Sequence, residues 1–123
     1  MSKEILIVDD SPSVRRMVSM TLQQAGYTVA EAVDGAKGLE AAKARRYDMV
    51  ITDQNMPNMT GLELLQNIRQ NSGCTDMPVL MVTAEGLKEN VLEAVKAGVS
   101  NYVVKPFTAE VLQEKIETIF KKR

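Results

Sequence analysis

The sequence predicts an α/β fold built on a five-stranded parallel sheet, and three observations support this class. Short apolar runs rich in Val and Ile alternate with segments whose apolar residues recur at helical spacing. The runs are nearly unbroken, as expected of strands that are buried on both faces. A helical segment separates each run from the next, which suits right-handed crossovers between parallel strands. We therefore expect one domain, residues 1–123, with five strands and five helices.

The first half of the chain carries clear boundary signals for its first helix. The run Ile5-Leu6-Ile7-Val8 predicts a strand, and Ser11 followed by Pro12 is typical of a helix N-terminus. Val14, Met17, Val18, Leu22 and Ala25 then recur at helical spacing, until Gly26 ends the helix. The expected elements are, in order, strand 4–8, helix 12–25, strand 28–32, Ala-rich helix 36–45 and strand 48–52.

The second half repeats the alternation. Leu62, Leu65 and Ile68 share one helical face, Pro78 leads into an apolar run, and Gly98 ends the next helix. The last helix carries an apolar stripe of Leu112, Ile116, Ile119 and Phe120. The expected elements are helix 61–70, strand 79–82, helix 86–97, strand 101–104 and helix 108–121.

Composition excludes several classes of function. The net charge is −1, so no basic field favours nucleic acid. No apolar stretch approaches the roughly 20 residues that span a bilayer, so we expect no membrane insertion. The lone cysteine, Cys74, cannot form an internal disulfide, and a free thiol suits a reducing cytoplasm. We expect a cytoplasmic protein.

Polar side chains stand at the ends of the apolar runs. Asp9 and Asp10 follow the first run, Asp53 the third, Thr83 the fourth and Lys105 the fifth. Each alone has an ordinary interpretation, such as a helix cap, a turn residue or a solvated lysine. Because the carboxyl ends of parallel strands meet at one edge of a sheet, the joint pattern favours a binding site there.

Three adjacent carboxylates repel one another, so the cluster needs a cation. Hard oxygen ligands with few protein contacts favour Mg²⁺, which is often shared with a phosphate. Lysine and Mg²⁺ beside an aspartate suit phosphoryl transfer, and an aspartate can itself accept the phosphoryl group.

These residues closely resemble the receiver domains of two-component response regulators, and most of all the single-domain chemotaxis regulators. The resemblance covers essentially the whole chain and implies a flavodoxin-like strand order of 2-1-3-4-5 with helices on both faces. It is carried by the stretches Ile7–Ser11, Asn55–Leu65, Pro78–Glu85 and Tyr102–Thr108.

The resemblance implies a role for each site residue. Asp53 is the expected acceptor of a phosphoryl group from a sensor histidine kinase, in a protein that helps catalyse its own phosphorylation and dephosphorylation without being a classical enzyme. Thr83 and Lys105 are expected to contact phosphoryl oxygens, and Tyr102 to rotate when Thr83 moves. The Lys105–Pro106 bond is expected to be cis. The expected Mg²⁺ ligands are Asp10, Asp53, the backbone carbonyl of Asn55 and, mainly through water, Asp9.

Helix 86–97 carries more apolar residues than one buried stripe needs. The set Leu87, Val91, Leu92, Ala94, Val95 and Ala97 is either extra core or part of a partner surface. The resemblance implies a face that contacts the flagellar motor switch or another protein target, in a chain we expect to be a monomer. The expected partner face consists of Lys88, Val91, Val95, Tyr102, Val104, Val111 and Lys115.

Other functions remain as alternatives. A single-domain relay that passes its phosphoryl group to a histidine phosphotransfer protein would have the same site. A phosphohydrolase would need a second acid where Asn55 stands, and a flavodoxin would need a Ser/Thr-rich loop in place of Asp9-Asp10. Gln54 departs from the tryptophan common in chemotaxis regulators, whereas Asn55 and Glu85 match the positions that influence dephosphorylation.

Overall fold

The computed structural model describes residues 3–71, 73, 75–83 and 88–121, with side chains for the same residues except 88–91. Cys74, Glu85 and Leu87 therefore lie outside the described residues. Strands and helices alternate along the chain as predicted. The elements are β1 (Glu4–Val8), α1 (Pro12–Gln24), β2 (Thr28–Ala32), α2 (Gly35–Ala44), β3 (Met49–Asp53), α3 (Gly61–Gln70), β4 (Val79–Thr83), α4 (Lys88–Lys96), β5 (Asn101–Val104) and α5 (Ala109–Lys121).

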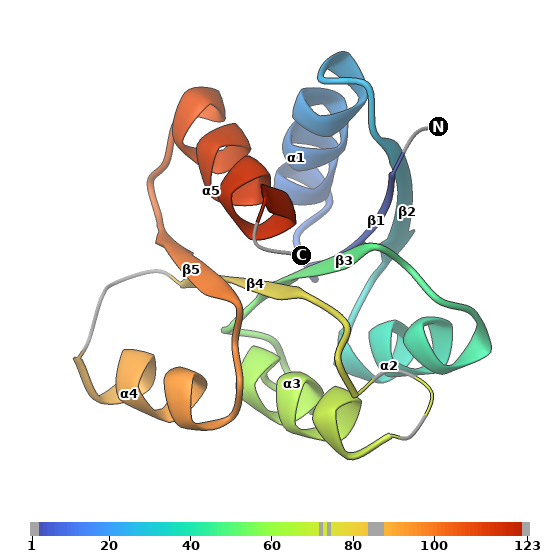
Figure 1. Cartoon of the computed structure of the whole chain (residues 1–123), viewed down its shortest axis with the longest axis vertical. Coiled ribbons are helices and arrows are strands. Elements are labelled where there is room, and N and C mark those ends of the chain that lie inside the picture. The colour runs from blue at the N-terminus through green and yellow to red at the C-terminus, as the bar shows by residue number, and fades with distance from the viewer. Residues whose placement is uncertain (1–2, 72, 74, 84–87, 122–123) are drawn as a thin grey trace.

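The five strands form one parallel sheet in the order β2-β1-β3-β4-β5, which confirms the order implied by the resemblance. Helices α1 and α5 cover one face of the sheet, and α2, α3 and α4 cover the other (Figure 1). The ranges of β1, β2, α3 and β5 are as predicted, and the boundaries of the other elements differ from the prediction by one or two residues. The difference matters at Asp53 and Thr83, which are the last residues of their strands rather than the first residues beyond them.

Two apolar clusters fill the space on either side of the sheet. Leu6 and Val8 of β1 belong to the cluster under α2 and α3, whereas Ile5 and Ile7 belong to the cluster under α1 and α5. This alternation follows from the two-residue period of a strand, and burial on both faces explains the unbroken apolar runs. Met17 recurs at helical spacing with the other apolar residues of α1, but it is 47% exposed and faces solvent.

Helix caps fix where α1 and α3 begin, after the carboxyl ends of β1 and β3. The hydroxyl of Ser11 accepts a hydrogen bond from the Val14 amide, and Pro12 follows as the first helical residue. Thr60 and Glu63 form a reciprocal capping box at the start of α3. The caps therefore fix the helix ends of the two loops that leave the carboxyl edge of the sheet.

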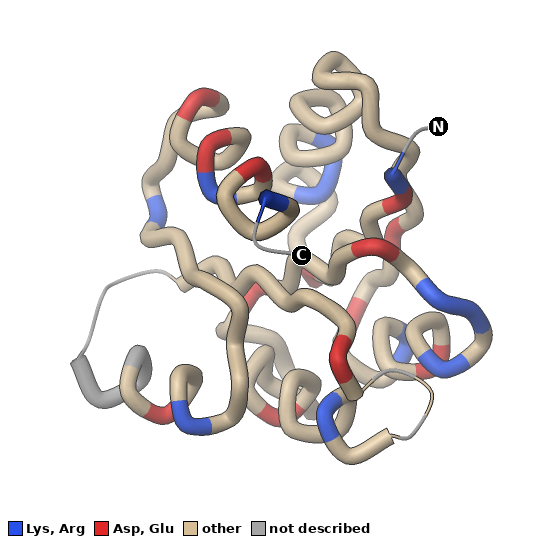
Figure 2. The backbone as a smooth tube through the Cα atoms, in the orientation of Figure 1, with Lys and Arg blue, Asp and Glu red and all other residues tan. Residues whose placement is uncertain are grey.

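Acidic and basic residues are interspersed over the elements, and both signs occur on both sides of the sheet (Figure 2). Within the described part of the chain, no helix is long and apolar enough to cross a bilayer.

Candidate functional site

The strand register brings the polar residues of neighbouring strands to one edge of the sheet. Val8 pairs with Thr52 in the parallel β1–β3 ladder, so Asp9 and Asp53 occupy the next position on adjacent strands. Asp53 in turn pairs with Val82, which places Thr83 one residue further along β4. The carboxyl edge of the sheet thus gathers side chains that lie far apart in the sequence.

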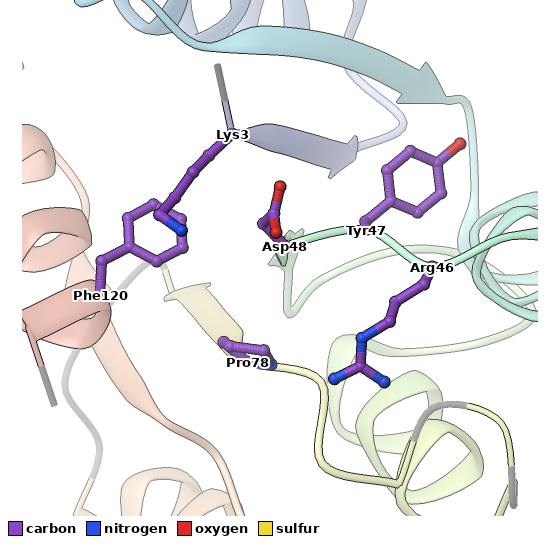
Figure 3. Close-up of a pocket in the computed structure, with 6 residues that line it drawn as sticks. All are labelled: Lys3, Arg46, Tyr47, Asp48, Pro78 and Phe120. Carbon is purple, nitrogen blue, oxygen red and sulfur yellow. The ribbon is translucent and has the colours of Figure 1, made fainter. Parts of the chain in front are cut away.

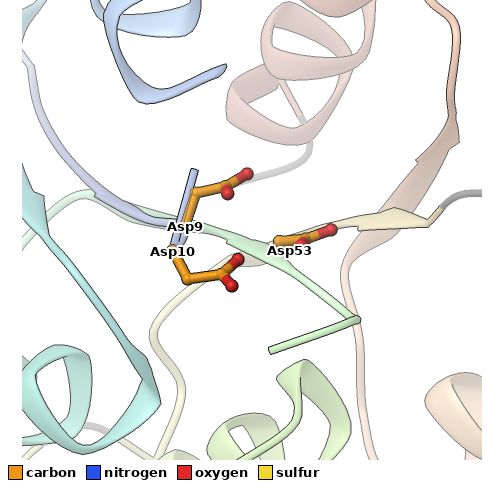
Figure 4. Close-up of side chains that lie close together, drawn as sticks. All are labelled: Asp9, Asp10 and Asp53. Carbon is orange, nitrogen blue, oxygen red and sulfur yellow. The ribbon is translucent and has the colours of Figure 1, made fainter. Parts of the chain in front are cut away.

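Asp9, Asp10 and Asp53 form a compact group of acids. One carboxylate oxygen from each can be chosen so that all three lie within 4.8 Å of one another (Figure 4). Asp9 and Asp53 are only 4% and 5% exposed, whereas Asp10 is exposed. Two buried carboxylates and one accessible carboxylate at this spacing offer the hard oxygen donors that divalent cations such as Mg²⁺ prefer.

The surroundings of Asp9 disfavour its negative charge. Burial is the main cause of its raised pKa, and the charges of Asp53 and Asp10 raise that pKa further. The Ser11 amide, which donates to Oδ1 of Asp9 at 2.8 Å, and the Lys105 ammonium act in the opposite direction. The metal-free cluster therefore has a need for positive charge that a divalent ion can meet.

Lys105 contributes a cation to the acid group. Its Nζ donates to Oδ1 of Asp53 at 3.2 Å, and both side chains are mostly buried. The Lys105 amide donates to the carbonyl of Thr83 at 2.8 Å, which ties the end of β5 to the end of β4. The Lys105–Pro106 bond is cis, as expected. Thr83 itself is buried beside this pair of strand ends.

The loop after Asp53 is held by a contact that the sequence analysis missed. The side-chain carbonyl oxygen of Gln54 accepts a hydrogen bond from the Leu62 amide at 2.8 Å, at the N-terminus of α3. The backbone N–H of Gln54 donates to the backbone carbonyl of Val82 at 2.8 Å. Gln54 therefore connects β4, β3 and α3. Asn55, the expected source of a carbonyl ligand, lies exposed within this loop.

A second missed residue is Arg15, one turn into α1. Its Nη1 donates to the main-chain carbonyl of Asp9 at 2.7 Å, and its Nε contacts Glu31 of β2 at 3.3 Å. A signal for it exists in the sequence, because a cation near a helix N-terminus is disfavoured by the helix dipole and needs a compensating partner.

The expected partner face lies on α4, β5 and α5. Val95, Val104 and Val111 are exposed, and Tyr102 and Lys115 are partly buried. The Nζ of Lys115 lies 5.8 Å from the centre of the Tyr102 ring. The side chains of Lys88 and Val91 lie outside the described residues.

The apolar residues of α4 that one buried stripe does not need are on the surface. Ala94 is buried against the sheet, whereas Leu92 and Val95 are 59% and 58% exposed. Both of these larger side chains therefore lie on the surface and not in an extra layer of core.

The acid group is separate from two pockets on the surface. One pocket, of about 290 Å³, opens where β1, β3 and β4 begin, at the other end of the strands from Asp53. Its lining contains acidic and basic side chains and the Phe120 ring (Figure 3). The Nζ of Lys3 lies 4.9 Å from the centre of that ring. The other, of about 410 Å³, lies along α2 next to Met59. Neither of these two pockets is lined by Asp9, Asp10 or Asp53.

Known proteins resemble this chain over nearly its whole length. Residues 5–117 match the response regulator receiver domain. The chemotaxis protein CheY of Pseudomonas aeruginosa is 48% identical over 120 residues, which are 97% of each chain.

Solved structures show the same architecture. The Vibrio cholerae chemotaxis protein CheY4, crystallised at pH 4.0, has a TM-score of 0.92 and 41% identity, covering 97% of this chain and 99% of that one. The receiver domain of the sensor histidine kinase PA1611 from Pseudomonas aeruginosa has a TM-score of 0.88 and 28% identity, covering 96% and 97%. That structure contains a magnesium ion coordinated in its active-site cleft.

Proposed function

This chain belongs to the response regulator receiver domain family, and we propose that it acts as a stand-alone phosphorylation switch. A sensor histidine kinase supplies the phosphoryl group, Asp53 accepts it, and a protein target recognises the modified form. One observation carries the proposal: the buried carboxylate of Asp53 lies beside two further acids and 3.2 Å from the ammonium of Lys105. The match over 97% of a chemotaxis protein supports a role in a cytoplasmic chemotaxis pathway.

The chemistry assigned to Asp53 is a direct phosphoryl transfer. A carboxylate oxygen of Asp53 forms a bond to phosphorus as the bond between phosphorus and the donor histidine nitrogen breaks, and the electron pair stays on that nitrogen. Lys105 and Thr83 contact the phosphoryl oxygens. These residues neutralise and orient the transferred group, so the chain assists its own modification while serving as a regulator.

A divalent ion fits the acid group. Asp9, Asp10, Asp53 and the backbone carbonyl of Asn55 are the residues that would hold it, with Asp9 acting mainly through water. The raised pKa of Asp9 supports this assignment, since it reflects a cluster short of positive charge. The magnesium ion in the related PA1611 receiver supports Mg²⁺ as the ion. When bound, Mg²⁺ neutralises the carboxylates and the incoming phosphoryl oxygens.

The signal leaves the site through β4 and β5. Phosphorylation adds negative charge and acceptor oxygens next to Thr83, whose hydroxyl moves toward them. Thr83 pairs with Val104 in the β4–β5 ladder, and Tyr102 lies two residues earlier on β5, on the same side of the strand. Movement of Thr83 therefore gives the Tyr102 ring room to change position.

The receiving surface is the exposed apolar face formed by Val95, Val104 and Val111, together with Tyr102 and Lys115. Isolated exposed apolar residues are ordinary, but several of them on β5, at one edge of the sheet, and on the helices before and after it suit a protein interface. We assign this face to a component of the flagellar motor switch, because the relatives are chemotaxis proteins.

Incubation with a small acyl phosphate and Mg²⁺ tests the assignment of Asp53. The wild-type chain should gain the mass of one acid-labile phosphoryl group, and Asp53→Asn, which keeps the shape of the side chain, should gain none. Asp76→Asn removes an exposed carboxylate elsewhere and should be labelled like the wild type. Labelling of the Asp53 variant would place the acceptor on another residue.

A further inference from the structure

Arg15 holds a position that ordinary helix chemistry does not favour. It stands four residues after the Ser11 cap of α1, where the partial positive charge of the helix N-terminus opposes a cation. Its side chain is nevertheless only 15% exposed and is held by three contacts in series. The Nη1 atom donates to the Asp9 carbonyl at 2.7 Å, Nε donates to Oε1 of Glu31 at 3.3 Å, and Oε2 of Glu31 accepts from the Ser19 hydroxyl at 2.9 Å.

Arg15 contacts the main-chain oxygen of Asp9 and not its carboxylate. The Asp9 carbonyl belongs to the planar peptide unit that joins Asp9 to Asp10, so gripping its oxygen restricts the direction of both acids. The guanidinium of Arg15 also pairs with Glu31, which lies on β2 opposite Ile7 of β1. Because Glu31 neutralises the guanidinium, Arg15 acts on the acid pair through geometry more than through charge.

We propose that Arg15, supported by Glu31 and Ser19, is a positioning residue that orients the Asp9–Asp10 peptide for a divalent ion and so favours Mg²⁺ over Ca²⁺. The inference rests on the proposed function, since it concerns the same site. Mg²⁺ demands nearly octahedral ligands at about 2.0–2.1 Å, whereas Ca²⁺ accepts six to eight flexible ligands at about 2.3–2.6 Å. Loosening the acid pair therefore penalises the smaller ion more.

Calorimetric titration of the purified chain with Mg²⁺ and, separately, with Ca²⁺ tests this role without requiring phosphorylation. Arg15→Ala should weaken Mg²⁺ binding by about tenfold, the lower range for loss of an outer-sphere partner, and should weaken Ca²⁺ binding by a clearly smaller factor. Arg15→Lys keeps the charge but lacks the planar fork, so its selectivity should lie between that of Arg15→Ala and the wild type. If Arg15→Ala does not fold, as shown by its metal-free melting curve, Arg15→Lys carries the same comparison.

Arg16→Ala is the matched control, because it removes the same charge from the neighbouring, exposed position of α1 and should leave both affinities unchanged. Equal losses of Mg²⁺ and Ca²⁺ affinity in the Arg15 variants would overturn the positioning role, and so would unchanged Mg²⁺ affinity. The proposed function has a separate readout, since it fails if wild-type Asp53 takes no label. If Asp53 is not phosphorylated but the preference for Mg²⁺ over Ca²⁺ depends on Arg15, the positioning role stands and the proposed function does not.

Discussion

Lys105 follows the edge strand β5, and its side chain extends past the end of β4 to place Nζ 3.2 Å from Oδ1 of Asp53 on β3. Asp53 is 5% exposed, so this ammonium compensates a carboxylate that water scarcely reaches. The contact spans three strands, and it couples the last strand of the sheet to the central acid. The first prediction follows from this pair.

Lys105→Ala should destabilise the metal-free protein while sparing the divalent ion. Loss of a hydrogen bond between charged groups costs about 1.5–3 kcal/mol, and the three acids are then left with less compensation. Mg²⁺ affinity should stay equal or rise, because a competing cation is gone. Urea unfolding with and without Mg²⁺ measures both effects, and Lys37→Ala, at an exposed site, is the control.

The same variant separates phosphorylation from signalling. In the wild type, acyl phosphate should shift the NMR resonances of the Tyr102 ring, whereas in Lys105→Ala any label on Asp53 should leave them in place. Weakened Mg²⁺ binding together with a preserved Tyr102 response would contradict the role given to Lys105.

The contribution of Asp9 to the pH dependence of stability should reverse sign when Mg²⁺ is added. The pKa of Asp9 is raised above its ordinary value of 3.8, chiefly by burial, so the native state binds this proton more tightly than the unfolded state does. In EDTA, the stability contributed by Asp9 is complete below 3.8 and is lost as pH rises through the raised pKa. Saturating Mg²⁺ binds the ionised cluster, so over the same interval stability should increase with pH.

Asp9→Asn isolates this effect. The variant keeps an oxygen for the Ser11 amide but removes the buried charge, so in EDTA its advantage over the wild type should grow as pH rises above 3.8. Denaturant unfolding at a series of pH values measures the difference, and Asp76→Asn should show no such trend. An advantage for Asp9→Asn that grows on acidification would contradict the sign.

Gly61→Ala should damage the loop that carries Asn55. A Cβ on Gly61 would lie 2.5 Å from the carbonyl oxygen of Asp53 and 2.9 Å from Cα of Gln54, and backbone atoms cannot move away cheaply. Overpacking of this kind costs about 1–3 kcal/mol, and the distorted loop should also slow labelling of Asp53.

Gly73→Ala provides the matched control, because a Cβ there meets nothing within 4 Å. It should be neutral or slightly stabilising, by up to about 1 kcal/mol, through a less flexible unfolded chain. Comparable unfolding free energies for the two alanine variants would show that the approach of Gly61 to Asp53 is not restrictive.

The sequence predicts the order of elements well because burial on both sheet faces leaves an unbroken signal. Ile5-Leu6-Ile7-Val8 could hardly be anything but a buried strand. The gathering of Asp9, Asp53 and Lys105 also follows from topology, since parallel strands share their carboxyl edge. The strand order itself needed the family resemblance.

Contacts between side chains of different elements could not be predicted in the same way. The hydrogen bond from Arg15 to the Asp9 carbonyl depends on Glu31, which orients the guanidinium. The position of Glu31 is set by the β1–β2 register and not by the sequence pattern around Arg15. The cap that Gln54 gives to α3 depends on the length of the intervening loop. Met17 follows the helical period of its neighbours, yet it is 47% exposed, because a periodic pattern alone does not show how wide the buried face of a helix is.

Val95→Glu should weaken recognition of the phosphorylated form and leave folding and phosphorylation unchanged. Val95 is exposed on α4, so the substitution should change the free energy of unfolding by less than about 0.5 kcal/mol. Labelling of Asp53 by acyl phosphate should be unchanged, because Val95 is an exposed residue of α4 whereas the acid group stands at the carboxyl ends of β1 and β3. Binding of the phosphorylated chain to a motor-switch protein should weaken at least tenfold, or about 1.4 kcal/mol, as for a central apolar contact.

Met20→Glu is the control for that experiment, since it places the same charge on an equally exposed residue of α1, remote from α4. Its target binding should match the wild type in a pull-down with the phosphorylated chain. If both variants keep the motor-switch protein, the assigned face is wrong. If the wild type instead transfers its label to a histidine phosphotransfer protein and ignores the motor switch, the chain is a relay intermediate. Loss of binding in Val95→Glu alone locates the output surface on α4.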